Sequence, residues 1–149
     1  MDQDDNGDGW VHCAQGHDHW GRFGAAGLLL WHDGAVLLQH RSRWSHHGGT
    51  WGVLGGARNS DETSVDTAAR EAAEEAGIGP GCYEVVGEHV DDHGGWSYVT
   101  VVGRAATAFR APQLTPESLA VDWVSVERMH DLPLHPGFAA TWEKVRQIG

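Results

Sequence analysis

A charged helical segment restricts the folding of this chain more than any other feature. Residues 64–76 read SVDTAAREAAEEA, and on a helix Glu71, Glu74 and Glu75 fall within roughly one third of the circumference. Like charges on one face destabilise a helix unless something compensates them, and a divalent cation can do so because Mg²⁺ prefers carboxylate oxygens. The opposite face of the helix is small and apolar, and we expect it to pack on a sheet. Its residues are Ala68, Ala69, Ala72, Ala73 and Ala76.

Both ends of this helix carry recognisable signals. Thr63 is placed to act as the N-cap of a helix that begins near Ser64, and Asp66 follows three residues later as a capping-box variant. Gly77 can take the left-handed conformation that ends helices, and Ile78 is then positioned for the accompanying apolar contact. The sequence therefore predicts a helix that ends at Gly77.

A longer pattern surrounds the helix. Gly55 and Gly56 let the backbone approach a ligand closely. From Gly56 the chain has five residues, Glu62, seven residues and then REAAEEAGI, which ends at Ile78. This arrangement resembles the signature of the Nudix hydrolase family at every specified position. Leu54 stands where the family commonly has proline, a departure that affects the rigidity of the turn more than the chemistry.

The resemblance implies an α/β fold, the Nudix-type α/β/α sandwich with a mixed sheet, and the order of predicted elements agrees with it. Asp33-Gly34 between two apolar runs predicts a hairpin. Strands are predicted at 23–31, 35–40, 83–91, 96–109 and 121–126, with a C-terminal helix at 136–147. We expect residues 1–9 (MDQDDNGDG) to form a flexible acidic tail and 10–149 a single hydrolase domain.

The resemblance also implies the metal ligands. Glu71, Glu74 and Glu75 would hold Mg²⁺ or Mn²⁺, and the carbonyl group of Gly56 is a further candidate ligand. Taken alone, the three glutamates are better explained as a solvated helix face, because such faces are common. The rest of the pattern in register makes the metal site the preferred interpretation.

Further catalytic roles follow from the same resemblance. Glu62 would orient a water or a ligand, and Arg70 would hold the surrounding carboxylates by charged hydrogen bonds. A carboxylate must accept the proton of the attacking water. The candidates are Glu71 and the loop residue Glu117, for which an ordinary solvated loop position is the alternative.

Residues outside the motif suggest how a substrate is held. Arg41 and Arg43 could grip a terminal phosphate, although a solvated loop explains them as well. Trp44 and Trp96 could stack on a base. The other tryptophans considered are interpreted as core residues: Trp20, Trp31, Trp51 and Trp123.

The chain also has a group of soft-metal ligands near its start. His12, Cys13, His17 and His19 lie close together but lack the paired spacing of a zinc site. We therefore interpret them as surface or packing groups, and Cys82 as a space-filling residue.

Charge and cysteine content narrow the partners. The 21 acidic and 10 basic residues give a formal net charge of −11, which disfavours nucleic-acid polymers and anionic membranes as partners. Two cysteines do not make a disulfide framework, and no leader or spanning segment is visible, so a cytoplasmic location is expected. A homodimer is compatible with the sequence, which does not fix the oligomeric state.

The function expected from the resemblance is metal-dependent hydrolysis of a diphosphate linkage in a nucleoside diphosphate derivative. Residues 93–95 (HGG) lack the proline of ADP-ribose types and the tyrosine of dinucleoside-polyphosphate types. A nucleoside triphosphate, normal or damaged, is the leading substrate hypothesis. The alternative is a regulatory module that binds a nucleotide without cleaving it, and a prenyl-diphosphate isomerase ranks below both.

Overall fold

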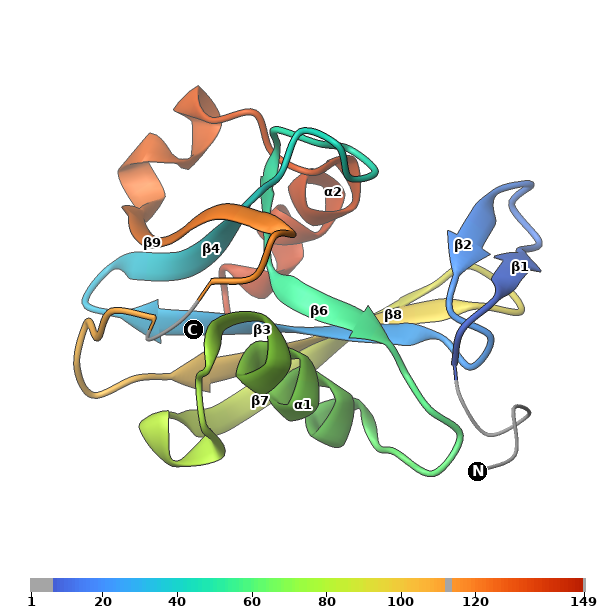
Figure 1. Ribbon diagram of the computed structural model, residues 1–149, viewed down its shortest axis with the longest axis horizontal. Coiled ribbons are helices and arrows are strands. Elements are labelled where there is room, and N and C mark those ends of the chain that lie inside the picture. The colour runs from blue at the N-terminus through green and yellow to red at the C-terminus, as the bar shows by residue number, and fades with distance from the viewer. Residues whose placement is uncertain (1–6, 112–113, 149) are drawn as a thin grey trace.

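A mixed β-sheet forms the centre of the computed structural model, which describes residues 7–111 and 114–148 (Figure 1). Within these residues the strand order is β5-β4-β3-β8-β7, with β6 also paired to β3 and β9 to β4. β3 and β8 run parallel, and the other pairs are antiparallel. The strands are β3 (Ala25–His32), β4 (Ala35–Arg41), β5 (Trp51–Gly52), β6 (Leu54–Ala57), β7 (Glu84–Asp92), β8 (Ser97–Arg104) and β9 (Ser118–Ser125).

Each face of the sheet is covered by one α-helix. Leu28 and Leu30 of β3 pack in a cluster with Ala68, Ala72 and Ala76 of α1 (Ser64–Ala76). Ala73, which was expected on the same face, is exposed instead. Leu29, which points to the opposite face, packs in a second cluster with α2 (Pro136–Val145). Two short 3₁₀ helices, η2 (Pro80–Cys82) and η3 (Val126–Asp131), are the other helical elements of residues 7–111 and 114–148. This layering confirms the predicted α/β sandwich.

The predicted turn between the first two long strands is confirmed. Asp33 and Gly34 both have positive φ, 48° and 76°, as a two-residue turn of this kind requires. The strand predicted over 96–109 ends earlier, at Arg104, and the next residues leave the sheet. There the carbonyl of Phe109 accepts a hydrogen bond from the indole of Trp123 at 2.7 Å.

A separate two-stranded hairpin, β1 (Trp10–His12) and β2 (Asp18–Trp20), was not predicted. Its strands are only three residues long and largely polar, so they carry no hydrophobic alternation. In Figure 1 the hairpin stands beside the turn between β7 and β8. The prediction that Trp20 belongs to the core is wrong, because 48% of this residue is exposed.

Residues 1–6 of the expected acidic tail lie outside the described residues. The amide of Gly7 donates to the side-chain oxygen of Asn59 at 3.0 Å, and its carbonyl accepts from the backbone amide of Arg22 at 2.7 Å. Among the described residues, no helix has both the length and the apolar content needed to cross a membrane.

Candidate active site

The start and end of α1 are fixed as predicted. The hydroxyl of Thr63 accepts from the amide of Asp66, and the Asp66 carboxylate accepts from the amide of Thr63, both at 3.1 Å. Gly77 has φ 70°, and Ile78, which is 1% exposed, donates to the carbonyl of Ala72 at 3.2 Å. These caps fix the position of the helix that carries the acidic residues.

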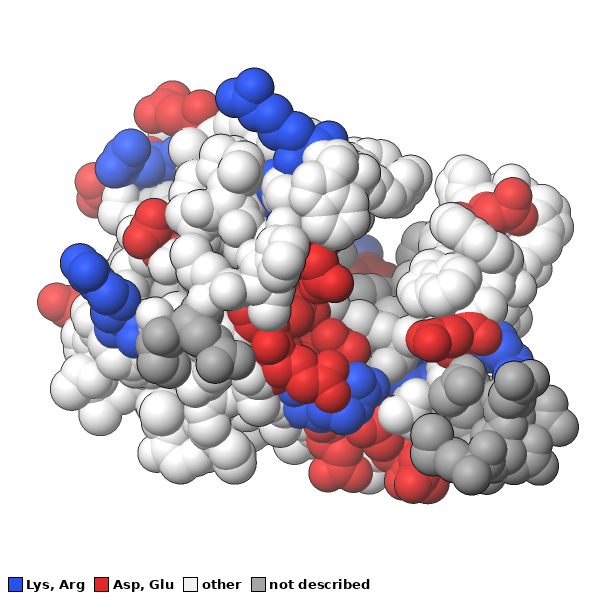
Figure 2. Space-filling view, in the orientation of Figure 1, with Lys and Arg blue, Asp and Glu red and all other residues white. Residues whose placement is uncertain are grey.

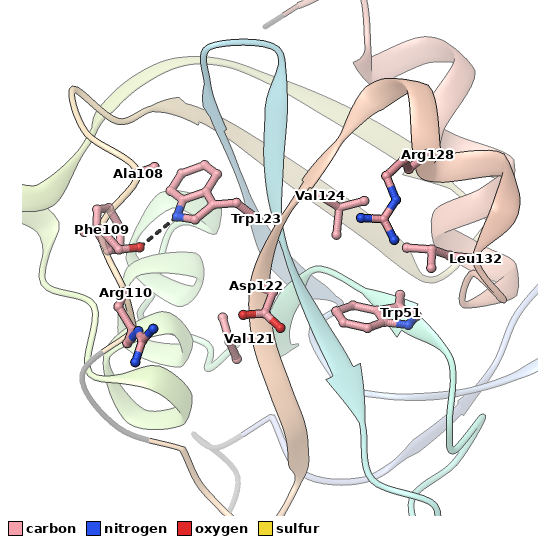
Figure 3. Close-up of a pocket in the computed structure, with 10 residues that line it drawn as sticks. All are labelled: Trp51, Ala108, Phe109, Arg110, Val121, Asp122, Trp123, Val124, Arg128 and Leu132. Atoms are coloured by element: carbon pink, nitrogen blue, oxygen red, sulfur yellow. Dashed lines mark hydrogen bonds between the residues drawn. The ribbon is translucent and has the colours of Figure 1, made fainter.

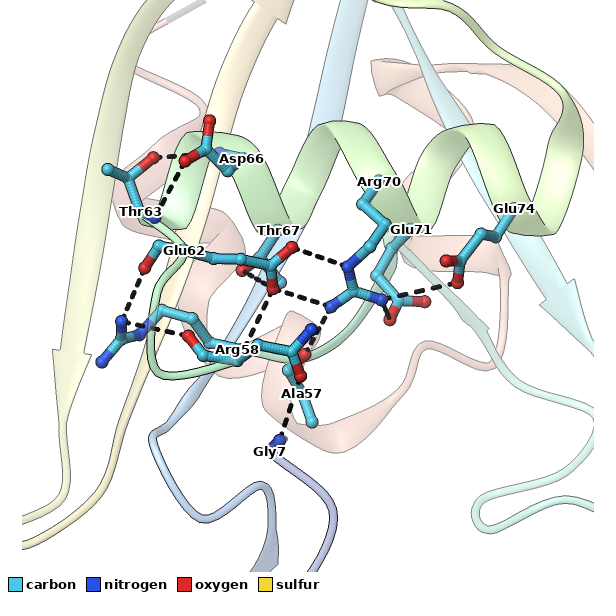
Figure 4. A network of polar contacts seen from close by, with 11 residues as sticks. Gly7, Ala57, Arg58, Glu62, Thr63, Asp66, Thr67, Arg70, Glu71 and Glu74 are labelled. Atoms are coloured by element: carbon cyan, nitrogen blue, oxygen red, sulfur yellow. Dashed lines mark hydrogen bonds and ion pairs between the residues drawn. The ribbon is translucent and has the colours of Figure 1, made fainter. Parts of the chain in front are cut away.

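Arg70 lies at the centre of a charged network at one side of α1 (Figure 4). Its guanidinium donates two hydrogen bonds to Glu62, at 2.7 and 2.9 Å, and one to the carbonyl of Ala57 at 2.9 Å. Glu62 also accepts from the amide of Asn59 and the hydroxyl of Thr67. Hydrogen bonds from Arg70 lower the pKa of Glu62, while burial acts in the opposite direction. Glu62 and Arg70 therefore join the loop before α1 to the helix.

Glu71 lies between this network and the glycine bend. Its carboxylate accepts from Arg70 at 3.0 Å. A Cβ atom added at Gly56 would lie 2.5 Å from the nearer carboxylate oxygen of Glu71. Glycine is therefore needed at position 56 to leave room for this carboxylate, which explains the pairing of these two positions in the motif.

Glu75 is buried, although the sequence placed it on a charged helix face. It is 6% exposed and hydrogen bonds to Gln39, whose amide nitrogen lies 3.2 Å away. Burial raises the pKa of Glu75 above its ordinary value, and a hydrogen bond and like charge from Glu71, followed by the charge of Glu117, act in the same direction. The carboxyl groups of Glu71 and Glu117 therefore lie near that of Glu75, where burial disfavours negative charge.

Glu74 is directed differently from its two neighbours. Its side chain is 59% exposed, and its carboxylate lies 3.4 Å from the guanidinium of Arg70. Figure 2 shows acidic side chains gathered at the centre of the visible face, next to a basic group. Glu71 and Glu75 are thus brought together, whereas Glu74 lies on the solvent side of them. We call Glu71, Glu74 and Glu75 the acidic group.

A cavity of about 510 Å³ opens beside Glu75. Of the predicted substrate residues, Arg41 and Trp44 line it, and so does Glu117. Its lining is formed by Trp20, Gln39, Arg41, Trp44, Ser45, His46, Gly55, Glu75 and Glu117. The two tryptophans are 48% and 70% exposed, so aromatic faces are available at the rim.

Two predicted substrate residues lie elsewhere. Arg43 is exposed in the loop after β4 and does not line this cavity. Trp96 stacks on His19 at the β7–β8 turn, with ring centroids 3.9 Å apart.

Sequence reasoning also missed several lining residues, among them Gln39 and Trp20. Gln39 could have been recognised, because it is a polar residue within the apolar run AVLLQH. A polar side chain buried in such a strand is expected to have a hydrogen-bond partner. Trp20 carried none, because its position depends on the unpredicted hairpin.

A second hollow of about 570 Å³ lies along β9 (Figure 3). Arg110 and Arg128 lie on either side of the strand, with Asp122 between them. No residue of the acidic group lines it. Its lining is Trp51, Ala108, Phe109, Arg110, Val121, Asp122, Trp123, Val124, Arg128 and Leu132.

The acidic group fits a divalent cation. A buried carboxyl group with raised pKa beside two further carboxyl groups is costly unless positive charge is supplied, and hard cations bind such oxygens. The space that Gly56 leaves in front of Glu71 allows the backbone and a carboxylate to approach the same point.

The family model described as "NUDIX domain" matches residues 21–144. The chain belongs to the Nudix family. It is 49% identical to a Mycobacterium tuberculosis protein (strain H37Rv) named "Putative 8-oxo-dGTP diphosphatase 3", over 95% of this chain and 70% of that protein. It is 40% identical to a Bifidobacterium longum "Nucleoside triphosphate pyrophosphatase/Nudix hydrolase fusion protein", over 93% of this chain and 30% of the fusion protein.

Among solved structures, the Nudix hydrolase RenU from M. smegmatis superposes with a TM-score of 0.89. It is 44% identical, and the match covers 95% of this chain and 94% of RenU. These comparisons confirm the predicted family and fold, and the chain is a Nudix hydrolase. Enzymes of this family generally use a divalent metal ion, as expected from the acidic group.

Proposed function

We propose that this Nudix hydrolase cleaves a nucleoside triphosphate, normal or oxidatively damaged, in a reaction that depends on Mg²⁺ or Mn²⁺. The observation that carries the proposal is that Glu71 and Glu117 both act on the buried Glu75, and that Glu75 and Glu117 line a cavity with Trp20 and Trp44 at its rim. The substrate class is supported by the names of the two relatives, one an 8-oxo-dGTP diphosphatase and the other containing a nucleoside triphosphate pyrophosphatase.

In this proposal Glu71, Glu74, Glu75 and the Gly56 carbonyl are the residues that would hold the metal. A bound divalent cation supplies an activated water and neutralises phosphate oxygens. Arg70 keeps the Glu71 carboxylate oriented through its 3.0 Å hydrogen bond.

The remaining roles belong to residues around the cavity. Glu117 is preferred over Glu71 as proton acceptor because it lines the cavity, whereas the Glu71 carboxylate accepts a hydrogen bond from Arg70. Arg41 is suited to a phosphate group, although its guanidinium now donates to the carbonyl of His46 at 2.9 and 3.0 Å. Trp20 and Trp44 are suited to stacking on the base. Mg²⁺ and Mn²⁺ share these oxygen ligands, so the preferred metal is decided by rate comparison.

The test is product release from a panel of dGTP, 8-oxo-dGTP, ADP-ribose and a dinucleoside polyphosphate, with each metal in turn. We expect the triphosphates to be the best substrates. Replacing Glu74 by glutamine should lower the rate at least about 100-fold, since a ligand to the metal is lost. Glu88→Gln is the matched control, because Glu88 is exposed on β7, away from the acidic group.

Two results would overturn the proposal. If Glu74→Gln turned over substrate as fast as the wild type, the acidic group would not be the site of the catalytic metal. Tight nucleotide binding without any cleavage, with either metal, favours the regulatory module instead.

A further inference from the structure

A second group of metal-ligating side chains lies outside the acidic site, where β1 and β2 meet the β7–β8 turn. Cys13, His17 and His19 come from the hairpin, and His93 comes from the turn. Their ligand atoms all lie within 4.8 Å of one another. We call these four residues the Cys-His cluster.

The fold explains why this cluster could not be recognised from the spacing of its residues in the sequence. His93 is far from the other three residues in sequence, so no paired motif is visible. His12, which the sequence suggested as a member, instead pairs with Asp18 at 2.8 Å. The cluster therefore contains His93, which only the tertiary structure brings close, in place of His12.

The donor set and its spacing suit zinc. Four ligand atoms around a tetrahedral Zn²⁺ lie about 3.3–3.7 Å apart, given Zn–N distances of about 2.0 Å and Zn–S of about 2.3 Å. The ligand atoms of the cluster lie within 4.8 Å of one another, so zinc binding would require only small rotations of the side chains. Thiolate and imidazole ligands select Zn²⁺ over Mg²⁺, which prefers oxygen.

Two buried nitrogen atoms of the cluster have no hydrogen-bond partner. They are Nε2 of His19 and Nδ1 of His93. A buried polar atom left without a partner costs about 1–3 kcal/mol, so such atoms usually have a role. Cys13 is itself 3% exposed. A metal ion bound through these two nitrogen atoms would satisfy both.

Backbone contacts already hold the two segments together. The amide of Ala14 donates to the carbonyl of Gly94, and that of Cys13 to the carbonyl of His17, both at 2.8 Å. A Cβ atom at Gly94 would lie 2.6 Å from that of Ala14, and Gly94 has φ 72°, so glycine is required at this contact. The ligands are therefore held by well-defined backbone and not by loose side chains alone.

We propose that Cys13, His17, His19 and His93 form a structural Zn²⁺ site that fastens the N-terminal hairpin to the β7–β8 turn. Four protein ligands leave no open position, as in structural rather than catalytic zinc sites. The site also fixes the position of Trp20, which follows His19 directly and lines the cavity beside Glu75. The zinc site is tested by metal content and not by turnover, so it and the proposed hydrolysis can each fail without the other.

The test is zinc content in untagged protein purified without chelator. Wild-type protein should contain about one Zn²⁺ per chain. His17→Ala and His93→Ala should retain less than about a tenth of it, because three ligands bind zinc far more weakly than four. His12→Ala and Cys82→Ser are the matched controls, and both should keep the metal. His17 is exposed, so its replacement does not endanger folding.

Cobalt gives an independent readout of the sulfur ligand. Chelator-treated wild-type protein reloaded with Co²⁺ should show a thiolate-to-cobalt charge-transfer band and tetrahedral visible bands, and Cys82→Ser should show the same spectrum. Cys13→Ser should lack the charge-transfer band. Chelator should lower the melting temperature of the wild type but not of His17→Ala. Wild-type protein that binds neither metal, or a His93→Ala variant with full zinc content, overturns the proposal.

Discussion

Gly56 shows how a single missing side chain shapes the acidic site. A Cβ atom there would meet both oxygens of the Glu71 carboxylate, at 2.5 and 2.9 Å. Arg70 holds this carboxylate on its other side, so it has little freedom to move away. Glycine is therefore needed here to leave space for the Glu71 carboxylate. The backbone conformation does not require it, because its φ is not in the left-handed region.

Replacing Gly56 by alanine should therefore reduce activity much more than stability. The displaced carboxylate lies at the end of a flexible side chain, so we expect a loss in free energy of unfolding of about 1 kcal/mol. The rate should fall about 10–100-fold because a metal ligand is misplaced. Gly79→Ala is the control, since no atom lies within 4 Å of its added Cβ. Denaturant unfolding and turnover measured on both variants test this, and an unchanged rate in Gly56→Ala contradicts it.

Individual elements show which features the sequence can predict. The ends of α1 depend on neighbours within a few residues, so Thr63, Asp66 and Gly77 could be assigned correctly. The hairpin of β1 and β2 could not, because its position depends on contacts with residues 93–96 of the β7–β8 turn. The burial of Glu75 was missed for a similar reason, since its hydrogen bond to Gln39 of β4 forms only in the folded chain.

The start of α2 depends on a histidine and should therefore respond to pH. Nδ1 of His135 accepts from the amide of Gly137 at 3.1 Å. Burial, with the nearby positive charges of Arg41, His47 and His46, lowers the pKa of His135 to about 4. Because the unfolded chain takes up this proton near pH 6.5, the stabilising contribution is complete above that pH and is lost as the pH falls towards 4.

His135→Asn separates this effect from other titrations. Asparagine is a good N-cap and does not titrate. Between pH 7 and pH 5 the wild type should lose about 1 kcal/mol more stability than the variant, a figure reduced for screening because the ring is partly exposed. Urea unfolding at both pH values measures the difference. Parallel pH profiles for the two proteins would show that His135 contributes nothing.

At the scale of the whole molecule, charge opposes folding unless a cation is bound. The net charge is −11, and Glu75 is buried near Glu71 and Glu117. Its raised pKa means that the folded protein keeps a proton that the unfolded chain loses above pH 4.5. This carboxyl group therefore makes the metal-free protein less stable as the pH rises, and the acidic site is maintained at a cost in stability.

Glu75→Gln should consequently be more stable than the wild type in Mg²⁺-free buffer at pH 8, by about 1–3 kcal/mol, while its catalytic rate falls. Added Mg²⁺ should raise the melting temperature of the wild type and have much less effect on the variant, because binding to the folded state alone stabilises it. Mg²⁺ prefers oxygen ligands and leaves the Cys-His cluster unaffected, so the two metal sites are tested separately. Glu88→Gln should behave as the wild type in both measurements. If Mg²⁺ stabilised Glu75→Gln and the wild type equally, the cation would be binding away from this carboxylate, and the buried acidic group would need another explanation.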